Sequence, residues 1–158
     1  MWAHPTDHHV SLFFLDVKAA FPSVVPERLL HNMCKCGIPK QYTDWYHTRL
    51  TGRQMVLCFD NYTSPSFNIA SGINQGCLLS AFSFLFYNAN ILDIPNRKNG
   101  EIGSGFIDNI AFGMQGPTFS ASNQKIQVMM EKRGGCIEWS QIHHVNFEMD
   151  KNALVQVS

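Results

Sequence analysis

Short apolar runs alternate along the chain with segments bounded by proline or glycine. The run 11–15 ends at Asp16 and predicts a buried strand with a carboxylate at its carboxyl end. Pro26 begins a predicted helix that extends to about Cys36, because proline suits the first helical turn and a glycine follows the end. A second helix, rich in aromatic residues, is expected over 39–52.

The middle of the chain has the pattern of a hairpin, a loop and a helix. Segments 55–59 and 66–70 flank a turn-rich loop, which predicts two paired strands. Residues 72–76 form a loop bracketed by glycines, and an apolar helix is expected from about 79 to 94. The aromatic residues of this helix surround its axis and are expected to pack in a core: Phe82, Phe84, Phe86 and Tyr87.

Two further apolar runs, 102–107 and 110–114, are separated only by Asp108 and Asn109. Such runs predict short strands, and two polar residues between them predict a tight hairpin turn. Both residues are also common in ordinary turns, so the turn by itself indicates no chemistry.

The last part of the chain predicts a helix over 116–143, weakened at Gly134 and Gly135, and a closing strand over 153–157. The skeleton is then βαββαβ with an insertion, which is the ferredoxin-like α+β arrangement: an antiparallel sheet with helices packed on one face. In this topology the first strand lies beside the central hairpin. Asp16 and Asp108, about 90 positions apart in the sequence, are therefore expected to meet at one edge of the sheet.

Length and composition indicate one folded domain over residues 1–158. A hydrophobic fraction of 45% supports a core and argues against disorder. Twelve basic residues balance twelve acidic ones, so the formal net charge is zero, which argues against strong autonomous binding of nucleic acid.

The five cysteines form no repeating framework and predict reduced thiols in an intracellular protein. Cys34 and Cys36 are too close together for the usual spacing of zinc ligands. No apolar run reaches the roughly 18–20 residues of a membrane span, and no secretory leader is visible. The chain is therefore expected to be soluble.

Three segments carry a family resemblance: 16–21, 72–76 and 106–109. In this order they resemble the signature segments of reverse transcriptases, and specifically those of non-LTR retrotransposons. The match covers nearly the whole chain from about Phe13. It implies a palm domain, the catalytic core of an RNA-directed DNA polymerase.

The resemblance implies roles for the residues of the first two segments. Asp16 matches the metal-binding aspartate, and Phe21 matches the aromatic residue that favours deoxynucleotides by crowding the 2′ position of the sugar. Val17, Gln75 and Gly76 are implied to contact the incoming nucleotide. Without the resemblance, Asp16 would be a solvated strand-end residue and Phe21 an ordinary core aromatic.

The third segment and the following one complete the implied site. Asp108 matches a metal-binding aspartate, whereas Asn109 stands where a second aspartate is usual. Lys151 matches a lysine that approaches the phosphates, although a solvated surface lysine is an equal alternative. Asn74 stands where proline is usual, which is expected to loosen the loop. The implied cofactor is Mg²⁺ or Mn²⁺, with Asp16 and Asp108 as its protein ligands.

The implied partners are an RNA template, a DNA primer and deoxynucleoside triphosphates, and nuclear residence follows from the resemblance alone. The fingers and thumb of a complete polymerase are expected to be lacking, which leaves apolar surfaces available for self-association. Reduced or absent activity is expected for the isolated chain. Two alternatives remain open: a non-catalytic remnant acting at most as a binding or structural module, and an unrelated domain of the same topology, such as a nucleotide cyclase.

Overall fold

The computed structural model describes residues 9–157, which cluster into two compact units. Among the described residues, one unit combines 9–19 with 88–157, and the other comprises 20–87. Each unit is described by itself below. The single palm domain predicted for residues 1–158 stays a prediction.

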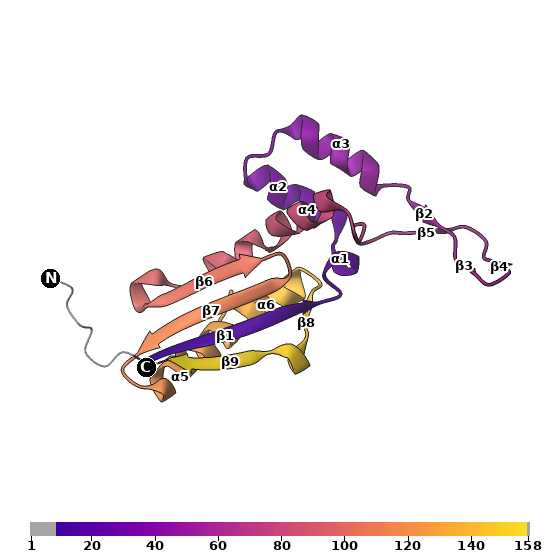
Figure 1. Ribbon diagram of the computed structural model, residues 1–158. Coiled ribbons are helices and arrows are strands. Elements are labelled where there is room, and N and C mark those ends of the chain that lie inside the picture. The colour runs from indigo at the N-terminus through magenta and orange to yellow at the C-terminus, as the bar shows by residue number, and fades with distance from the viewer. Residues whose placement is uncertain (1–8, 158) are drawn as a thin grey trace. The chain divides into compact units, whose positions relative to one another are not determined.

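The first unit is built on an antiparallel sheet with the strand order β6-β7-β1-β9 (Figure 1). These strands are β1 (His9–Lys18), β6 (Glu101–Phe106), β7 (Asn109–Gly116) and β9 (Ala153–Val157). The short strand β8 (Asn146–Phe147) pairs with the end of β1, beyond the part that pairs with β9. The strand over 153–157 is thus confirmed.

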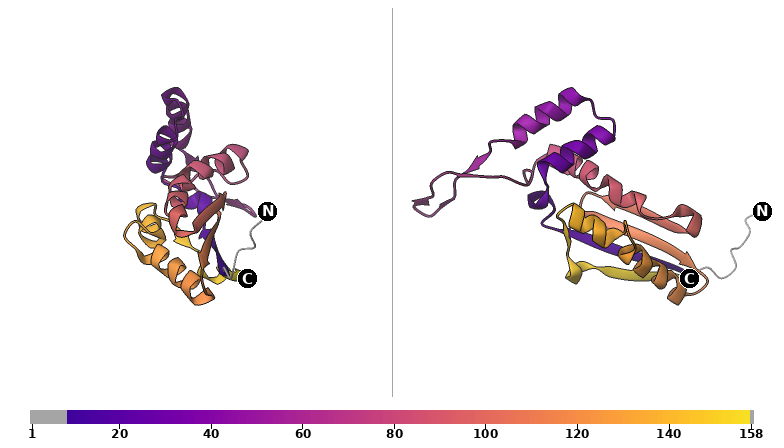
Figure 2. Two further views of the ribbon diagram at one scale, coloured as in Figure 1. Left: turned by 90° about the vertical axis from the view of Figure 1, so that its left-hand side faces the viewer. Right: turned by 180° about the vertical axis from the view of Figure 1, so that it is seen from behind.

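Helices α5 (Phe119–Glu131) and α6 (Cys136–Ile142) lie over one face of this sheet, as the right-hand view of Figure 2 shows. The sequence predicted one helix over 116–143, which is wrong in detail because the chain breaks at two glycines. Gly134 adopts φ +71°, which glycine accepts without strain. At Gly135 an added Cβ would lie 2.4 Å from the Met129 carbonyl oxygen, so no larger residue fits there.

The side chains of β1 alternate between the two faces of the sheet, as the pleat requires. Ser11 and Leu15 are buried, and the Ser11 hydroxyl bonds the Ser122 hydroxyl of α5 at 2.7 Å. Phe112, paired with Phe13 and completely buried, belongs to the same helix-covered face. Burying this apolar surface stabilises the unit by roughly 25 cal/mol per Å² removed from water.

The other face of the sheet exposes several large apolar side chains. They belong to three different strands: Phe14, Ile102, Val155 and Val157. The helix-covered and open faces, together with the strand order, give the ferredoxin-like βαββαβ arrangement predicted from the sequence. The α+β fold class is therefore confirmed.

Other element boundaries also differ from the prediction. Strand β1 continues past Asp16 to Lys18, because β8 pairs with Val17 and Lys18 and extends the ladder. The apolar helix predicted over 79–94 is α-helical only from Leu78 to Asn88 (α4), and a 3₁₀ helix, η1 (Ala89–Asp93), replaces its last part.

The second unit contains α1 (Ala20–Ser23), α2 (Pro26–Lys35), α3 (Lys40–Leu50) and most of α4. Proline at the first turn of α2 and Gly37 after its end agree with the predicted boundaries. Phe84 and Tyr87 of α4 are buried as predicted. Phe82 is 55% exposed, so the core role predicted for this residue is wrong.

Between α3 and α4 the chain forms an exposed hairpin. The predicted pairing is present but interrupted: β2 (Gln54–Met55) pairs with β5 (Phe67–Asn68), and β3 (Cys58–Phe59) with β4 (Tyr62–Thr63). Every strand residue of this hairpin is exposed. The two short ladders therefore have no core of their own, which leaves this segment among the least stabilised parts of the unit.

The longest helix among residues 9–157, α5, has 13 residues. A membrane span needs about 20 apolar residues, so none of the described helices could cross a membrane.

Candidate functional site

Asp16 and Asn109 are register partners in the ladder between β1 and β7. Directly opposed residues point to the same face of a sheet, so both side chains lie on the open face. The backbone N–H of Val17 donates to the Asp108 carbonyl at 3.1 Å, which holds Asp108 beside the segment that carries Asp16. The topology therefore brings Asp16 and Asp108 together, as the strand order predicted.

The turn that carries Asp108 differs from the prediction by one residue. Its two central residues are Ile107 and Asp108, because Asn109 already pairs with Phe106 in one ladder and with Asp16 in the other. The predicted turn of Asp108 and Asn109 is thus wrong. Asn109 is the first residue of β7, and its side-chain amide donates to Asp108 Oδ1 at 3.2 Å.

Lys151 joins Asp16, Asp108 and Asn109 through an ion pair with Asp16. Its Nζ donates to Asp16 Oδ2 at 2.7 Å, and the Asp16 carbonyl accepts the Glu148 backbone N–H at 2.8 Å. The bond to Asp16 and the charge of that carboxylate raise the pKa of Lys151, with smaller contributions from Glu148 and Asp108. Lys151 is therefore a firmly charged ammonium in a site of carboxylates.

The ion pair between Lys151 and Asp16 is partly open to solvent. The Asp16 side chain is 17% exposed, whereas the Lys151 side chain is 66% exposed. A second basic residue, Lys18, lies 3.8 Å from Glu148. Among residues 9–157 no cluster of three or more histidine, cysteine, aspartate or glutamate side chains could hold a metal ion. Any cation at this site would thus need ligands besides the carboxylates.

The second unit contains the glycine-bracketed loop that the sequence singled out. The Gly72 N–H donates to the Val24 carbonyl at 2.7 Å, and the Ile73 N–H donates to the Phe21 carbonyl at 2.9 Å. Gly72 has φ +82°, and an added Cβ would lie 3.0 Å from the Cα of Pro22. Only glycine satisfies both conditions, which explains the residue at this position.

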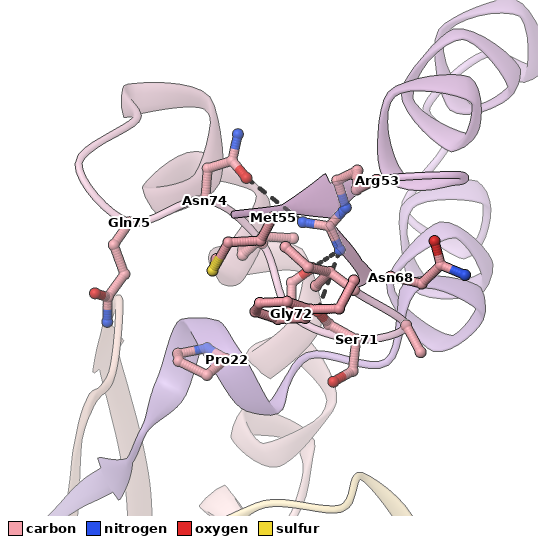
Figure 3. Close-up of a pocket in the computed structure, with 12 residues that line it drawn as sticks. Pro22, Arg53, Met55, Asn68, Ser71, Gly72, Asn74 and Gln75 are labelled. Atoms are coloured by element: carbon pink, nitrogen blue, oxygen red, sulfur yellow. Dashed lines mark hydrogen bonds between the residues drawn. The ribbon is translucent and has the colours of Figure 1, made fainter. Parts of the chain in front are cut away.

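Arg53 anchors this loop, a role that the sequence did not reveal. Its Nη2 donates to the carbonyls of Ser71 at 3.2 Å and Gly72 at 2.6 Å, and its Nη1 to Asn74 Oδ1 at 3.4 Å (Figure 3). The Nε donates to the Leu50 carbonyl at 3.0 Å, which ties the loop to the end of α3. One guanidinium thus satisfies three carbonyls and an amide, a use of the arginine fork that lysine cannot match.

Gln75 and Gly76 are exposed at the far end of the loop, and the Gln75 side chain points away from Arg53 (Figure 3). The pocket beneath is about 800 Å³ in volume and is lined by Arg53 and residues 67–75 among others. Phe21 is half-buried against Phe84, with ring centroids 5.7 Å apart.

Cys77 follows this loop at the start of α4. Hydrogen bonds with the backbone of Ser80 and Leu79 lower the pKa of the Cys77 thiol. All five cysteines are free in the structure.

The predicted site residues divide between the two units. Asp16, Asp108, Asn109 and Lys151 come together in the first unit. Val17 also belongs to it, but its side chain is buried, and its backbone N–H bonds the Asp108 carbonyl. Phe21, Gln75 and Gly76 belong to the second unit.

Sequence reasoning missed two residues that hold this arrangement, Arg53 and Asn88. The Asn88 side-chain amide donates to the Ile107 carbonyl in the turn before Asp108. Neither residue belongs to a recognisable motif, so no signal in the sequence indicated these contacts.

No family model matches the chain. Its sequence is similar to the "Retrovirus-related Pol polyprotein from type-2 retrotransposable element R2DM" of Drosophila melanogaster, with 26% identity over 132 residues. These residues make up 82% of this chain but only 12% of that polyprotein. The chain thus spans about an eighth of the length of this curated relative.

The fold is similar to that of the telomerase of Candida tropicalis. Its complex with a fragment of telomeric RNA superposes with a TM-score of 0.68 at 9% sequence identity, covering 94% of this chain and 26% of that one. The apo enzyme truncated from its C-terminal domain superposes with a TM-score of 0.67 at 9% identity, covering 95% and 31%. At this identity the likeness concerns the fold alone.

The sequence similarity and the fold together support a reverse-transcriptase-like domain. Within that class, the resemblance to non-LTR retrotransposon polymerases noted in the sequence agrees with the similarity to the type-2 retrotransposable element.

Proposed function

We propose that this chain is a reverse-transcriptase palm domain that adds deoxynucleotides to a primer 3′-hydroxyl on an RNA template. One observation carries the proposal: Asp16, Asp108, Asn109 and Lys151 meet where β1 passes the β6–β7 turn. The type-2 retrotransposon relative supports the choice of an RNA template. Activity of the isolated chain is reduced or absent, because Asn109 and the pairing of Asp16 with Lys151 both weaken a metal site.

The residues present fit a divalent cation of the Mg²⁺ type. Asp16 and Asp108 supply hard carboxylate oxygens, and the Asn109 amide oxygen is a weaker ligand of the same kind. Mg²⁺ is commonly held by only one or two carboxylates, with substrate phosphates and water completing its shell. When bound, the metal supplies charge neutralisation at the transferring phosphoryl group and activation of the attacking hydroxyl.

The remaining chemistry belongs to side chains of this chain. The Lys151 ammonium leaves Asp16 and pairs with the triphosphate, where it neutralises charge that develops on the pyrophosphate. From this position it donates a proton to the leaving group. Its exposure supports the proposed movement, since two-thirds of the side chain is in solvent.

The second unit binds the substrates in this proposal. Gln75 and Gly76 contact the incoming nucleotide and template, with the loop held in place by Arg53. Phe21 limits the space at the sugar 2′ position and so selects deoxynucleotides. Val17 contributes through its backbone, which fixes Asp108. We propose that both units form one palm domain, whose exposed apolar surfaces contact other parts of a polymerase or a second copy.

A non-catalytic remnant is the second candidate, and the ion pair between Lys151 and Asp16 favours it. A carboxylate already neutralised by an ammonium attracts a metal ion less strongly, and Asn109 removes another negative charge. An unrelated domain of the same topology is less favoured, because Phe21, Gln75 and Gly76 match the reverse-transcriptase pattern. The implied nuclear residence stays a prediction.

Primer extension on an RNA template, with Mg²⁺ and with Mn²⁺, tests the proposal. The purified chain is compared with Asp16→Ala after circular dichroism has shown that both are folded. Extension that Asp16→Ala abolishes supports a working palm. The alternative result is a folded chain that does not extend a primer and is not stabilised by Mn²⁺ and a deoxynucleotide. That result supports the non-catalytic remnant.

A further inference from the structure

The turn that presents Asp108 has an unusual backbone. Ile107, its first central residue, has φ +57°, whereas Asp108 is not among the residues with positive φ. A two-residue hairpin turn with a positive φ only at its first central position takes glycine there by preference. Isoleucine is branched at Cβ and is a poor residue for this conformation, so the turn is strained unless its surroundings hold it.

The residues on either side of the turn are exposed, whereas Ile107 and Asp108 themselves are half-buried. Phe106, immediately before it, is 72% exposed, and Asn109, immediately after it, is also exposed. Two hydrogen bonds to its carbonyl groups also hold it. Val17 N–H bonds the Asp108 carbonyl at 3.1 Å, and the Asn88 side-chain amide bonds the Ile107 carbonyl.

The Asn88 side chain is buried and is well placed to hold the turn through its hydrogen bond to the Ile107 carbonyl. It is only 5% exposed, and although it precedes η1 its side chain caps no backbone N–H of that helix. Its Oδ1 is buried without a hydrogen-bond partner among the described residues, so the hydrogen bonding of its side chain is directed to Ile107. Leu92 of η1 lies 3.5 Å from the Cβ position of Gly105, which holds this segment against β6.

We propose that Asn88 is a positioning residue for Asp108. Its amide holds the Ile107 carbonyl and thereby keeps the strained turn in the conformation that places the Asp108 carboxylate beside Asp16. Asn88 contacts neither substrate nor metal. The inference rests on the proposed function in one respect, that Asp108 is a ligand of the divalent cation.

Asn32 offers a matched control. It is also a buried asparagine, 1% exposed, and its amide also donates to backbone carbonyls while Oδ1 lacks a partner. Its bonds go to Phe86 and Tyr87 at 3.3 and 3.2 Å, within the second unit. Asn32→Leu therefore removes a donor of the same kind from an equally buried position, and this donor does not bond the turn.

Amide hydrogen exchange at Val17 is the first measurement, because this N–H bonds the Asp108 carbonyl and needs no metal. Asn88→Leu keeps the size of the side chain and removes the donor. We expect Val17 to exchange about tenfold faster in Asn88→Leu than in the native chain, relative to amides of the β1–β7 ladder. Equal exchange, or the same acceleration in Asn32→Leu, overturns the proposal. Should Asn88→Leu not fold, Asn88→Ser takes its place.

A second variant, in which the backbone strain at position 107 is relieved, shows whether Asn88 positions the turn or only stabilises the fold in general. Glycine at position 107 adopts the turn without strain, so Ile107→Gly added to Asn88→Leu is expected to restore slow exchange at Val17. If Val17 exchanges as fast in the double variant as in Asn88→Leu, the proposed positioning role of Asn88 is contradicted.

Mn²⁺ affinity gives the functional readout. We expect it to fall about fivefold to tenfold in Asn88→Leu and to return in the double variant with Ile107→Gly. Two results together argue against a positioning role. They are an Mn²⁺ affinity of Asn88→Leu equal to that of the native chain, and a clear loss of Mn²⁺ affinity in Asp16→Ala. If Asp16→Ala leaves Mn²⁺ affinity unchanged, the metal site itself fails, and the exchange measurement still decides whether Asn88 holds the turn.

Discussion

The Lys151 ammonium lies 2.7 Å from the Asp16 carboxylate, although 135 positions separate the two residues in the chain. In this arrangement the lysine occupies one oxygen of the carboxylate proposed to bind metal. The same residue is proposed to serve the phosphates when substrate is present. Lys151 therefore has opposite effects on two measurable quantities.

Replacing Lys151 with alanine is expected to strengthen metal binding and weaken catalysis. Loss of the competing ammonium should tighten Mn²⁺ binding about threefold to tenfold. Loss of the proton donor should slow primer extension by about 10²-fold or more. Calorimetric titration and primer extension measure the two effects. Lys18→Ala is the control, because Lys18 pairs with Glu148 rather than Asp16. Unchanged Mn²⁺ affinity in Lys151→Ala would contradict the competition.

Restoring aspartate at position 109 is expected to raise both metal affinity and activity. Asn109 is the register partner of Asp16, so a carboxylate there joins the same face of the sheet. Charge count tunes the affinity of oxygen sites, and we expect Mn²⁺ to bind about tenfold more tightly to Asn109→Asp. Asn109→Ala serves as the control for loss of the amide oxygen. If Asn109→Asp extends primers no faster than the native chain, some other defect limits activity.

Cys77 and Cys136 are expected to differ strongly in reactivity. Backbone hydrogen bonds lower the pKa of Cys77, whereas burial raises the pKa of Cys136 to about 12. The thiolate is the reactive form, so iodoacetamide at neutral pH should modify Cys77 first and Cys136 only on unfolding. Peptide mass spectrometry over time gives both rates. Faster labelling of Cys136 than of Cys77 in the folded chain would contradict the burial of α6.

The Cys136 thiol also predicts a loss of stability in alkali. Its pKa is 9.0 in the unfolded chain and about 12 in the folded one, so the folded state binds the proton more tightly. The stability this provides is fully present below pH 9 and is lost as pH rises through about 12. Urea unfolding at pH 8 and 10.5 should show a smaller loss in Cys136→Ala than in the native chain. If Cys136→Ala and the native chain lose the same amount of stability between the two pH values, the pKa of the Cys136 thiol is not raised by its burial.

Arg53→Lys is expected to loosen the loop at Gly72 while the charge is kept. Lysine cannot reach the carbonyls of Ser71 and Gly72 and the Asn74 amide together. Losing hydrogen bonds from a charged donor should cost about 1–3 kcal/mol of local stability. Hydrogen exchange at the amides of Gly72 and Ile73 measures this loss. Arg49→Lys is the control, because Arg49 lies on α3 and stacks over Trp45 instead of bonding the loop. Equal exchange in the two variants would show that Arg53 does not anchor the loop.

Local signals in the sequence determined much of this protein. Apolar runs and proline or glycine boundaries predicted the strands, the start of α2 and the glycine loop, because these features depend on nearby residues and on backbone freedom. The order of strands and helices then predicted the βαββαβ topology. That topology was enough to bring Asp16 and Asp108 together, since strand order alone decides which strand ends are neighbours.

Only the tertiary structure decided the details on which the site depends. Pairing of Asn109 with both Asp16 and Phe106 moved the turn by one residue, and β8 extended β1 past Asp16. The contacts of Lys151 with Asp16, of Arg53 with the loop and of Asn88 with Ile107 join residues far apart in the chain. Hydropathy and turn propensity describe one stretch of chain at a time. They carry no information on which distant carbonyl or carboxylate a polar side chain will meet once the elements have packed.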